Sequence, residues 1–224
     1  MNITRRKFLL GASTIALLST VLTLAGGLGG LIPAHAQTAS SAELMAPGPL
    51  PEQALGKSDA PVTVIEYASM TCPHCADFHA STYPELKKRY IDTGKVRFIF
   101  REFPLDPLAT AGFMLARCAG EDKYFPMIEL LFATQRQWAV KNPVDPLFNT
   151  VKQAGFTKES FTQCLDTKNN AASRKMWEDL EKVRERGAKL GVNSTPTFFI
   201  NGKMHRGGAS IEELDKLIQA QIKS

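Results

Sequence analysis

Two cysteines separated by two residues, Cys72 and Cys75, are the side chains of this sequence best suited to chemistry. They enclose Pro73 and His74 and follow residues 62–68, a β-branched and apolar stretch that predicts a buried strand. Because proline is favoured in the first turn of a helix, the pair is expected where a strand ends and a helix begins. Free backbone N–H groups at such a place stabilise a thiolate, the form of cysteine that exchanges with disulfides.

The pKa of the outer thiol, Cys72, would set the direction of this exchange. If it falls from about 8.5 to roughly 5, the reduced form gains ~2.7 kcal/mol at pH 7, or ~60 mV in a two-electron couple. A protonated His74 would add positive charge nearby. A stabilised dithiol makes the disulfide a stronger oxidant. An ordinary pKa at Cys72, or a Cys72 buried away from solvent, would contradict this hypothesis.

The predicted elements show how the cysteine pair would be supported. They are a strand at 62–68, a helix from 73 to about 90 with a kink at Pro84, a strand at 95–101, a helical block at 106–189, strands at 197–200 and 203–206, and a closing helix capped by Ser210 and Glu213. Asn201-Gly202 is a strong hairpin signal. Neither group of strands can bury its apolar face alone, so both must share one sheet. The predicted fold class is α/β, with a helical domain inserted between two halves of the sheet.

The first 36 residues predict a signal peptide. A basic start at residues 5–7 leads into a long apolar run, and a small-x-small sequence predicts cleavage after Ala36. The start resembles a twin-arginine export signal, although Leu10 stands where that motif often ends in a basic residue. An uncleaved membrane anchor is the alternative, since the run is long enough to span.

The segment 37–60 is rich in Ala, Ser, Pro and Gly and predicts an extended arm or linker. It is too short for a separate dimerisation domain, so we expect a monomer. The formal net charge is +5, and residues 5–7 supply +3 of it. The remaining +2 is too small to indicate binding of nucleic acid or of an anionic membrane surface.

The cysteine count fits an exported protein, because disulfides persist outside the cytosol. Four cysteines follow the predicted signal: Cys72, Cys75, Cys118 and Cys164. They allow three pairings. The close spacing of two of them favours one short functional pair and one long structural pair.

Three motifs together resemble the DsbA family of periplasmic disulfide oxidoreductases, which has a thioredoxin-like fold. They are Val64-Ile65-Glu66-Tyr67, Cys72-Pro73-His74-Cys75 and Thr195-Pro196-Thr197. The resemblance implies a first thioredoxin-like half at 61–105, an inserted helical domain at 106–189 and a second half at 190–224. It also implies a cis peptide bond at Pro196, with Thr195 and Pro196 presenting backbone to a substrate strand beside the cysteines.

The resemblance also implies a role for Glu66. It lies six residues before Cys72, like the buried acid of the family, and shares a strand face with Val62 and Val64. The functional interpretation is a proton relay to the second thiol, Cys75. The alternative is a carboxyl group satisfied by a neighbouring lysine or water, because a lone buried acid is costly.

Some alphaproteobacterial members of the family carry a second disulfide, and this sequence resembles them through Cys118 and Cys164. Such a bond would close a loop of about 46 residues, worth roughly 4 kcal/mol in the chain-entropy model. Two buried free thiols are the alternative. A further alternative is that the Cys118–Cys164 pair has a redox-regulatory role.

The implied activity is that of a dithiol oxidase. A thiolate of a reduced exported protein attacks Cys72 in the Cys72–Cys75 disulfide, and Cys75 leaves. A quinone-linked membrane protein of the DsbB type would restore the disulfide, and no soluble cofactor is needed. The nearest rival is an isomerase or reductase that is kept reduced. A non-catalytic metal carrier or chaperone is the more distant alternative.

Other residues suggest less. His79 lies one turn after Cys75 and is expected on the helix surface. No metal site is predicted, because tetrahedral zinc is poorly matched by four side chains crowded into one helix start: Cys72, His74, Cys75 and His79. Two tryptophans in the helical block, Trp138 and Trp177, are expected to pack between helices.

Overall fold

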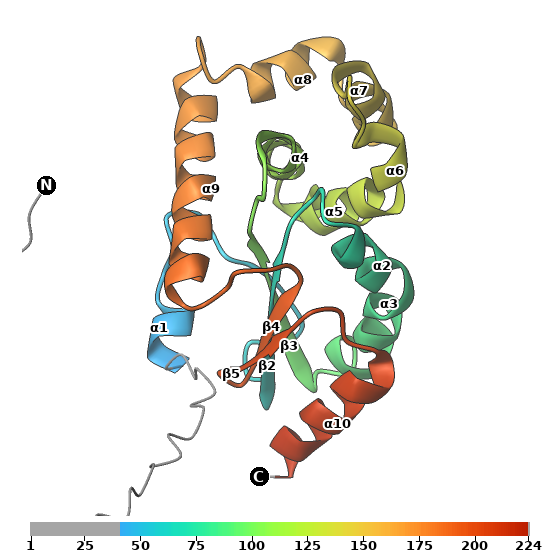
Figure 1. Ribbon diagram of the computed structural model, residues 1–224, viewed down its shortest axis with the longest axis vertical. Coiled ribbons are helices and arrows are strands. Elements are labelled where there is room, and N and C mark those ends of the chain that lie inside the picture. The colour runs from blue at the N-terminus through green and yellow to red at the C-terminus, as the bar shows by residue number, and fades with distance from the viewer. Residues whose placement is uncertain (1–40, 224) are drawn as a thin grey trace, which may run out of the picture. The chain divides into compact units, whose positions relative to one another are not determined.

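The computed structural model describes residues 41–223 (Figure 1). The predicted signal peptide, residues 1–36 with cleavage after Ala36, lies outside the described residues. Within the described part of the chain, every helix is too short or too polar to cross a membrane.

The sheet has five strands in the order β1-β3-β2-β4-β5. Their bounds are Gln53–Leu55 (β1), Val62–Ala68 (β2), Val96–Glu102 (β3), Thr197–Ile200 (β4) and Lys203–Arg206 (β5). The pair β2 and β3 is parallel, and every other neighbouring pair is antiparallel. The two halves of the chain therefore meet in one sheet, as predicted. At the β4–β5 turn Asn201 and Gly202 take positive φ values of 44° and 85°, the conformation for which this dipeptide is suited.

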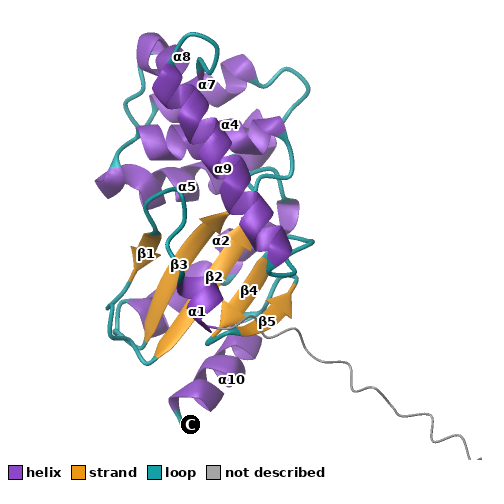
Figure 2. Cartoon of the chain, turned by 90° about the vertical axis from the view of Figure 1, so that its left-hand side faces the viewer, coloured by secondary structure: helices purple, strands orange, loops and turns teal. Residues whose placement is uncertain are grey.

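Helices cover both faces of the sheet (Figures 1 and 2). On the face of Val64 and Phe98 lie α2 (Pro73–Ser81), α3 (Tyr83–Leu86), the π-helical turn η1 (Lys87–Ile91) and α10 (Ile211–Ile222). On the other face, Leu44 of α1 (Ser41–Met45) packs with Ile65 and Phe199. The predicted helix from 73 to 90 is thus divided at Thr82, two residues before Pro84. The capping box of Ser210 and Glu213 starts α10 as predicted.

The helical insertion follows β3 and precedes β4, at one end of the sheet (Figure 2). It contains α4 (Pro107–Cys118), η2 (Glu121–Lys123), α5 (Tyr124–Ala133), α6 (Gln135–Trp138), α7 (Val144–Lys152), α8 (Lys158–Leu165) and α9 (Ala171–Lys189). Trp138 is fully buried in its core, and Trp177 packs partly buried against that core. The last turns of α9 approach the sheet closely at Gly187, where a Cβ atom would lie 2.7 Å from the Tyr67 ring.

The segment 37–60 is not a plain linker, which corrects the prediction for its described part. It forms the short helix α1 and the edge strand β1, which pairs antiparallel with β3. Three arginines of the folded body hold it: Arg101 and Arg186 donate to the Leu44 carbonyl, and Arg117 donates to the Pro51 carbonyl. These elements are too short to show apolar periodicity, so their contacts, and not their sequence pattern, fix them.

Candidate active site

The cysteine pair lies where β2 passes into α2, as the sequence predicts. Cys72 is the N-cap of α2 and Pro73 occupies its first turn. Both thiols are free; Cys75 is 0% exposed and Cys72 is 6% exposed, which is less than the sequence hypothesis expected. Pro73 and His74 are exposed between them. Of the two sulfur-bearing side chains only Cys72 keeps any exposure, so Cys72 is the one of the pair that an incoming thiolate can approach.

The pKa of Cys72 is lowered from 9.0 to about 5. The largest cause is the hydrogen bond from the Cys75 thiol; the Thr195 side chain and the backbone N–H groups of Cys75 and His74 add to it, whereas partial burial acts in the opposite direction. The helix start thus contributes as expected, but the partner thiol contributes most.

The pKa of Cys75 is raised far above its ordinary value. Burial is the largest cause, followed by its hydrogen bond to Cys72 and by the negative charge of Glu66. At neutral pH the pair therefore holds one thiolate and one thiol. The thiolate is on the sulfur that solvent reaches.

Titration of the reduced protein should show this asymmetry. We expect thiolate absorbance near 240 nm to change with a midpoint near pH 5, because the pKa of Cys72 is about 5. The Cys75→Ala variant removes the largest cause of the shift, so its midpoint should move toward that of a free thiol. A wild-type midpoint above pH 8 would contradict the assignment.

The same shift affects stability with a definite sign. Since the pKa of Cys72 is lower in the folded than in the unfolded reduced chain, ionisation stabilises the reduced fold fully above pH 9 and loses this effect as pH falls through about 5. At pH 7 we expect ionisation to contribute about 2 kcal/mol to the stability of the reduced protein, after allowance for solvent screening. The oxidised protein has no Cys72 thiol to titrate, so the stability of the reduced form relative to the oxidised form should fall by about this amount between pH 7 and pH 4, as measured by denaturation of both forms.

The loop between α9 and β4 faces the cysteine pair. The Thr195–Pro196 peptide bond is cis, as the resemblance implies. The Cys72 thiol donates a hydrogen bond to the Thr195 carbonyl at 3.2 Å. The Thr195 hydroxyl, buried and without a partner in this arrangement, can donate to the sulfur once Cys72 ionises.

Gln135 is a residue of the site that the sequence did not indicate. It lies in α6 of the insertion and is 5% exposed. Its Nε2 donates to the carbonyl oxygens of Met70 at 2.8 Å and Cys72 at 2.9 Å. The insertion thereby fixes the backbone on both sides of Thr71, directly before the helix start.

Glu66 is fully buried on the face of β2 that carries the cysteine pair, as predicted. Its partner is His79, whose Nε2 lies 3.0 Å from Glu66 Oε2. The expectation that His79 lies on the surface is wrong, because His79 is one turn beyond Cys75 on the buried side of α2 and only 8% exposed. The four-residue spacing from Cys75 could have indicated that His79 lies on the same buried side of the helix. Within residues 41–223 no three histidine, cysteine or acidic side chains are placed together to hold a metal ion.

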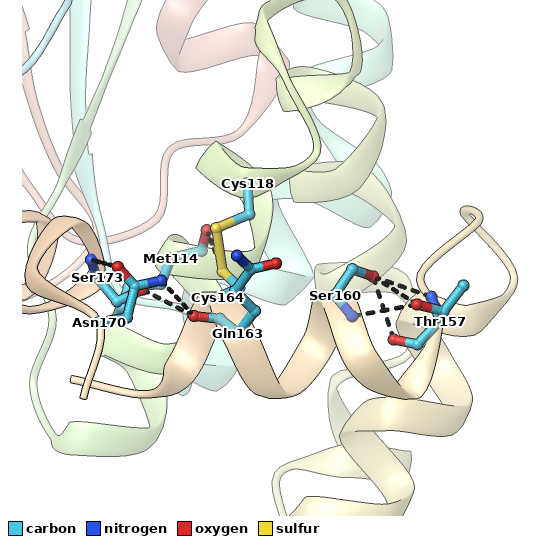
Figure 3. The surroundings of a disulfide bond; sticks show 8 residues. All are labelled: Met114, Cys118, Thr157, Ser160, Gln163, Cys164, Asn170 and Ser173. Carbon is cyan, nitrogen blue, oxygen red and sulfur yellow. Dashed lines mark hydrogen bonds between the residues drawn. A yellow bond between two sulfur atoms is a disulfide. The ribbon is translucent and has the colours of Figure 1, made fainter. Parts of the chain in front are cut away.

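The second cysteine pair forms a disulfide, Cys118–Cys164, with a Cα–Cα distance of 6.2 Å (Figure 3). Cys118 ends α4 and is exposed, whereas Cys164 in α8 is 5% exposed. The Met114 carbonyl oxygen lies 3.3 Å from Cys164 Sγ. This is a contact and not a hydrogen bond, because the bonded sulfur carries no proton. The alternative of two free thiols does not apply.

Comparisons with known proteins agree with this geometry. A profile of the thioredoxin family matches residues 50–220. The chain is 32% identical to alpha-DsbA1 of Wolbachia pipientis, whose crystal structure matches with a TM-score of 0.69 over 82% of this chain and 98% of that one. This chain belongs to the DsbA-like branch of the thioredoxin family. The predicted resemblance and the predicted fold class are thereby confirmed.

Two further relatives are named for disulfide chemistry. A candidate protein-disulfide oxidoreductase of Rickettsia conorii is 34% identical over 176 residues, which cover 76% of this chain. The chain spans only 61% of the length of that relative. Disulfide bond formation protein D of Bacillus subtilis is 28% identical, over 75% of this chain and 76% of its own length.

Proposed function

We propose that this DsbA-like protein is a periplasmic dithiol oxidase that introduces disulfide bonds into exported proteins. The observation that carries the proposal is the placement of Cys72 at the start of α2, against the Thr195 carbonyl and next to a fully buried Cys75, which lowers the pKa of Cys72 and raises that of Cys75. The low value stabilises the reduced enzyme and makes its disulfide oxidising. The names of the relatives support the same class of reaction.

The reaction runs through a mixed disulfide. A substrate thiolate attacks Cys72 Sγ, the Cys72–Cys75 bond breaks, and its electron pair passes to Cys75, which takes up a proton. A second substrate thiolate then attacks the substrate sulfur bonded to Cys72. The substrate leaves oxidised, and Cys72 leaves as the stabilised thiolate.

The surrounding residues have supporting roles in this proposal. Thr195 and Pro196 present backbone to the substrate strand, since the Thr195 carbonyl already lies against Cys72 Sγ. Pro73 and His74 form the exposed rim that the substrate meets. Glu66 exchanges the proton of Cys75, because its charge already acts on that thiol.

The proposed cellular setting rests on the N-terminal sequence and on the family resemblance. Residues 1–36 would direct export through the twin-arginine route, with cleavage after Ala36. A quinone-linked membrane protein of the DsbB type would reoxidise the cysteine pair, without a soluble cofactor. The Cys118–Cys164 disulfide would be structural.

The reduction potential of the Cys72–Cys75 couple tests this function. It is measured by equilibration with glutathione redox buffers, using a variant without Cys118 and Cys164 so that one couple titrates. We expect a value well above the roughly −270 mV of thioredoxin, toward the strongly oxidising end of the family range. A value near that of thioredoxin would overturn the oxidase assignment in favour of a protein that is kept reduced.

A further inference from the structure

The buried pair of Glu66 and His79 is incompletely satisfied. Among the residues that the structure describes, four buried side-chain polar atoms lack a hydrogen-bond partner, and Glu66 Oε1 and His79 Nδ1 are two of them. Folded proteins rarely leave such atoms unpaired, and a catalytic role is one recognised reason. The pair lies in the fold beside the cysteines, so its chemistry bears on theirs.

Aromatic rings enclose the imidazole. The His79 ring stacks on Phe132 with centroids 4.3 Å apart and lies 4.8 Å from the Tyr83 ring. Phe78 and Phe100 contact it edge-on. A charged ring here would leave an unpaired N–H donor at Nδ1 in an apolar cage. We therefore assign the proton that Glu66 Oε2 accepts to Nε2, the ring nitrogen that has a partner.

The titratable groups on which the Glu66 charge acts come from three helices: Cys75 in α2, Tyr83 in α3 and Tyr124 in α5. Glu129 and Asp92 also act on Tyr83, and Glu102 and Arg117 act on Tyr124. Burial is the largest cause that raises the pKa of Cys75, Tyr83 and Tyr124. The donor that the structure gives to the Glu66 carboxylate is His79.

Cys75 and His79 lie four residues apart on the buried side of α2, above the strand face that carries Glu66. The carboxylate is thus held through one oxygen by His79, while its other oxygen is free. On the basis of the function proposed above, we propose that His79 is a positioning residue for proton transfer at Cys75. Its Nε2–H stabilises the Glu66 carboxylate, so that Oε1 can take the Cys75 proton.

The step concerned is the resolution of a mixed disulfide on Cys72. The Cys75 thiol gives its proton to Glu66 Oε1, and the resulting thiolate attacks Cys72 Sγ. The bond from Cys72 to the bound thiol breaks, and the bound thiol leaves with the electron pair. Cys72 and Cys75 end as a disulfide, the released thiol is reduced, and Glu66 holds the proton. The same proton returns to Cys75 when the disulfide oxidises a substrate.

Oxidised glutathione separates this step from the preceding one. Mixed with the reduced protein, it first reacts with Cys72 to give a mixed disulfide, which Cys75 then resolves. Acid quenching and mass spectrometry follow both steps. In His79→Phe, which keeps an aromatic ring in the cage, we expect the second step to slow about tenfold or more at pH 7, the value of one hydrogen bond to a charged group. The first step should stay within about twofold, because it depends on Cys72.

Two further variants distinguish positioning from a packing role. His79→Gln offers an amide N–H in place of Nε2–H, and it should restore the second step to within about threefold of wild type. In a Glu66→Gln background the second step is already slow, and adding His79→Phe should slow it no further.

Equal slowing of both steps in His79→Phe, further slowing in the Glu66→Gln background, or an unchanged second step would overturn the proposal. None of these outcomes alters the reduction potential expected for wild type. A potential near that of thioredoxin would overturn the oxidase function, whereas the glutathione steps would still report on His79.

Discussion

Replacing Cys72 by serine should abolish the oxidation of a reduced two-cysteine peptide, by more than about a thousandfold. In the proposed reaction the substrate bonds to Cys72, and the fully buried Cys75 cannot replace it. The peptide assay follows loss of free thiols under a fixed oxidant supply. Residual turnover within tenfold of wild type would show that the chemistry takes place elsewhere.

The Cys75→Ser variant is the matched comparison. It also loses turnover, but the Cys72 thiolate remains and still attacks a sulfur of oxidised glutathione, releasing one reduced glutathione. Because serine cannot resolve the product, a stable glutathione adduct on Cys72 should accumulate and be visible by mass spectrometry. A Cys75→Ser protein that accumulates no adduct would contradict the assignment of Cys72 as the reactive sulfur of the pair.

Removing the second disulfide should lower the stability of the fold and leave the peptide oxidation activity in place. The Cys118→Ala/Cys164→Ala variant opens a loop with a sequence separation of 46 residues. We expect a loss of about 4 kcal/mol in the free energy of unfolding, or roughly 10 °C in Tm, because the unfolded chain regains its freedom. Denaturant and thermal unfolding of the oxidised proteins measure it.

The control keeps the second disulfide and removes the first pair, as Cys72→Ala/Cys75→Ala. Its unfolding shows what the loss of two sulfurs costs without opening the long loop. A loss below about 1 kcal/mol in the Cys118→Ala/Cys164→Ala variant would contradict a structural role. Peptide oxidation in that variant should continue, since the bond joins α4 to α8 within the insertion.

Much of this site could be predicted because its signals are local. The strand, the Cys-Pro-His-Cys turn and the helix follow one another within about twenty residues, and their residue types report the backbone directly. The hairpin at Asn201-Gly202 is predictable for the same reason. The cis bond before Pro196 rested on family resemblance, since the sequence permits a cis proline without requiring it.

What the sequence did not reveal depends on contacts between distant segments. His79 has no unusual neighbours in sequence, and its burial depends on which side of α2 meets the sheet. Residues 41–55 lack periodicity, and three arginines from elsewhere in the chain determine their path. Gln135 lies in a four-residue helix whose position depends on the packing of the whole insertion.

The two hydrogen bonds from Gln135 bear on protein engineering. A chimera that joins the sheet halves directly, or grafts in a helical block from another relative, would lose the amide that holds the carbonyls of Met70 and Cys72. Such a hybrid would retain both cysteines yet leave their turn unanchored. A chimera that keeps the active site must therefore include more than the thioredoxin-like sheet. It needs a side chain that donates hydrogen bonds to these two carbonyl oxygens, as Gln135 does.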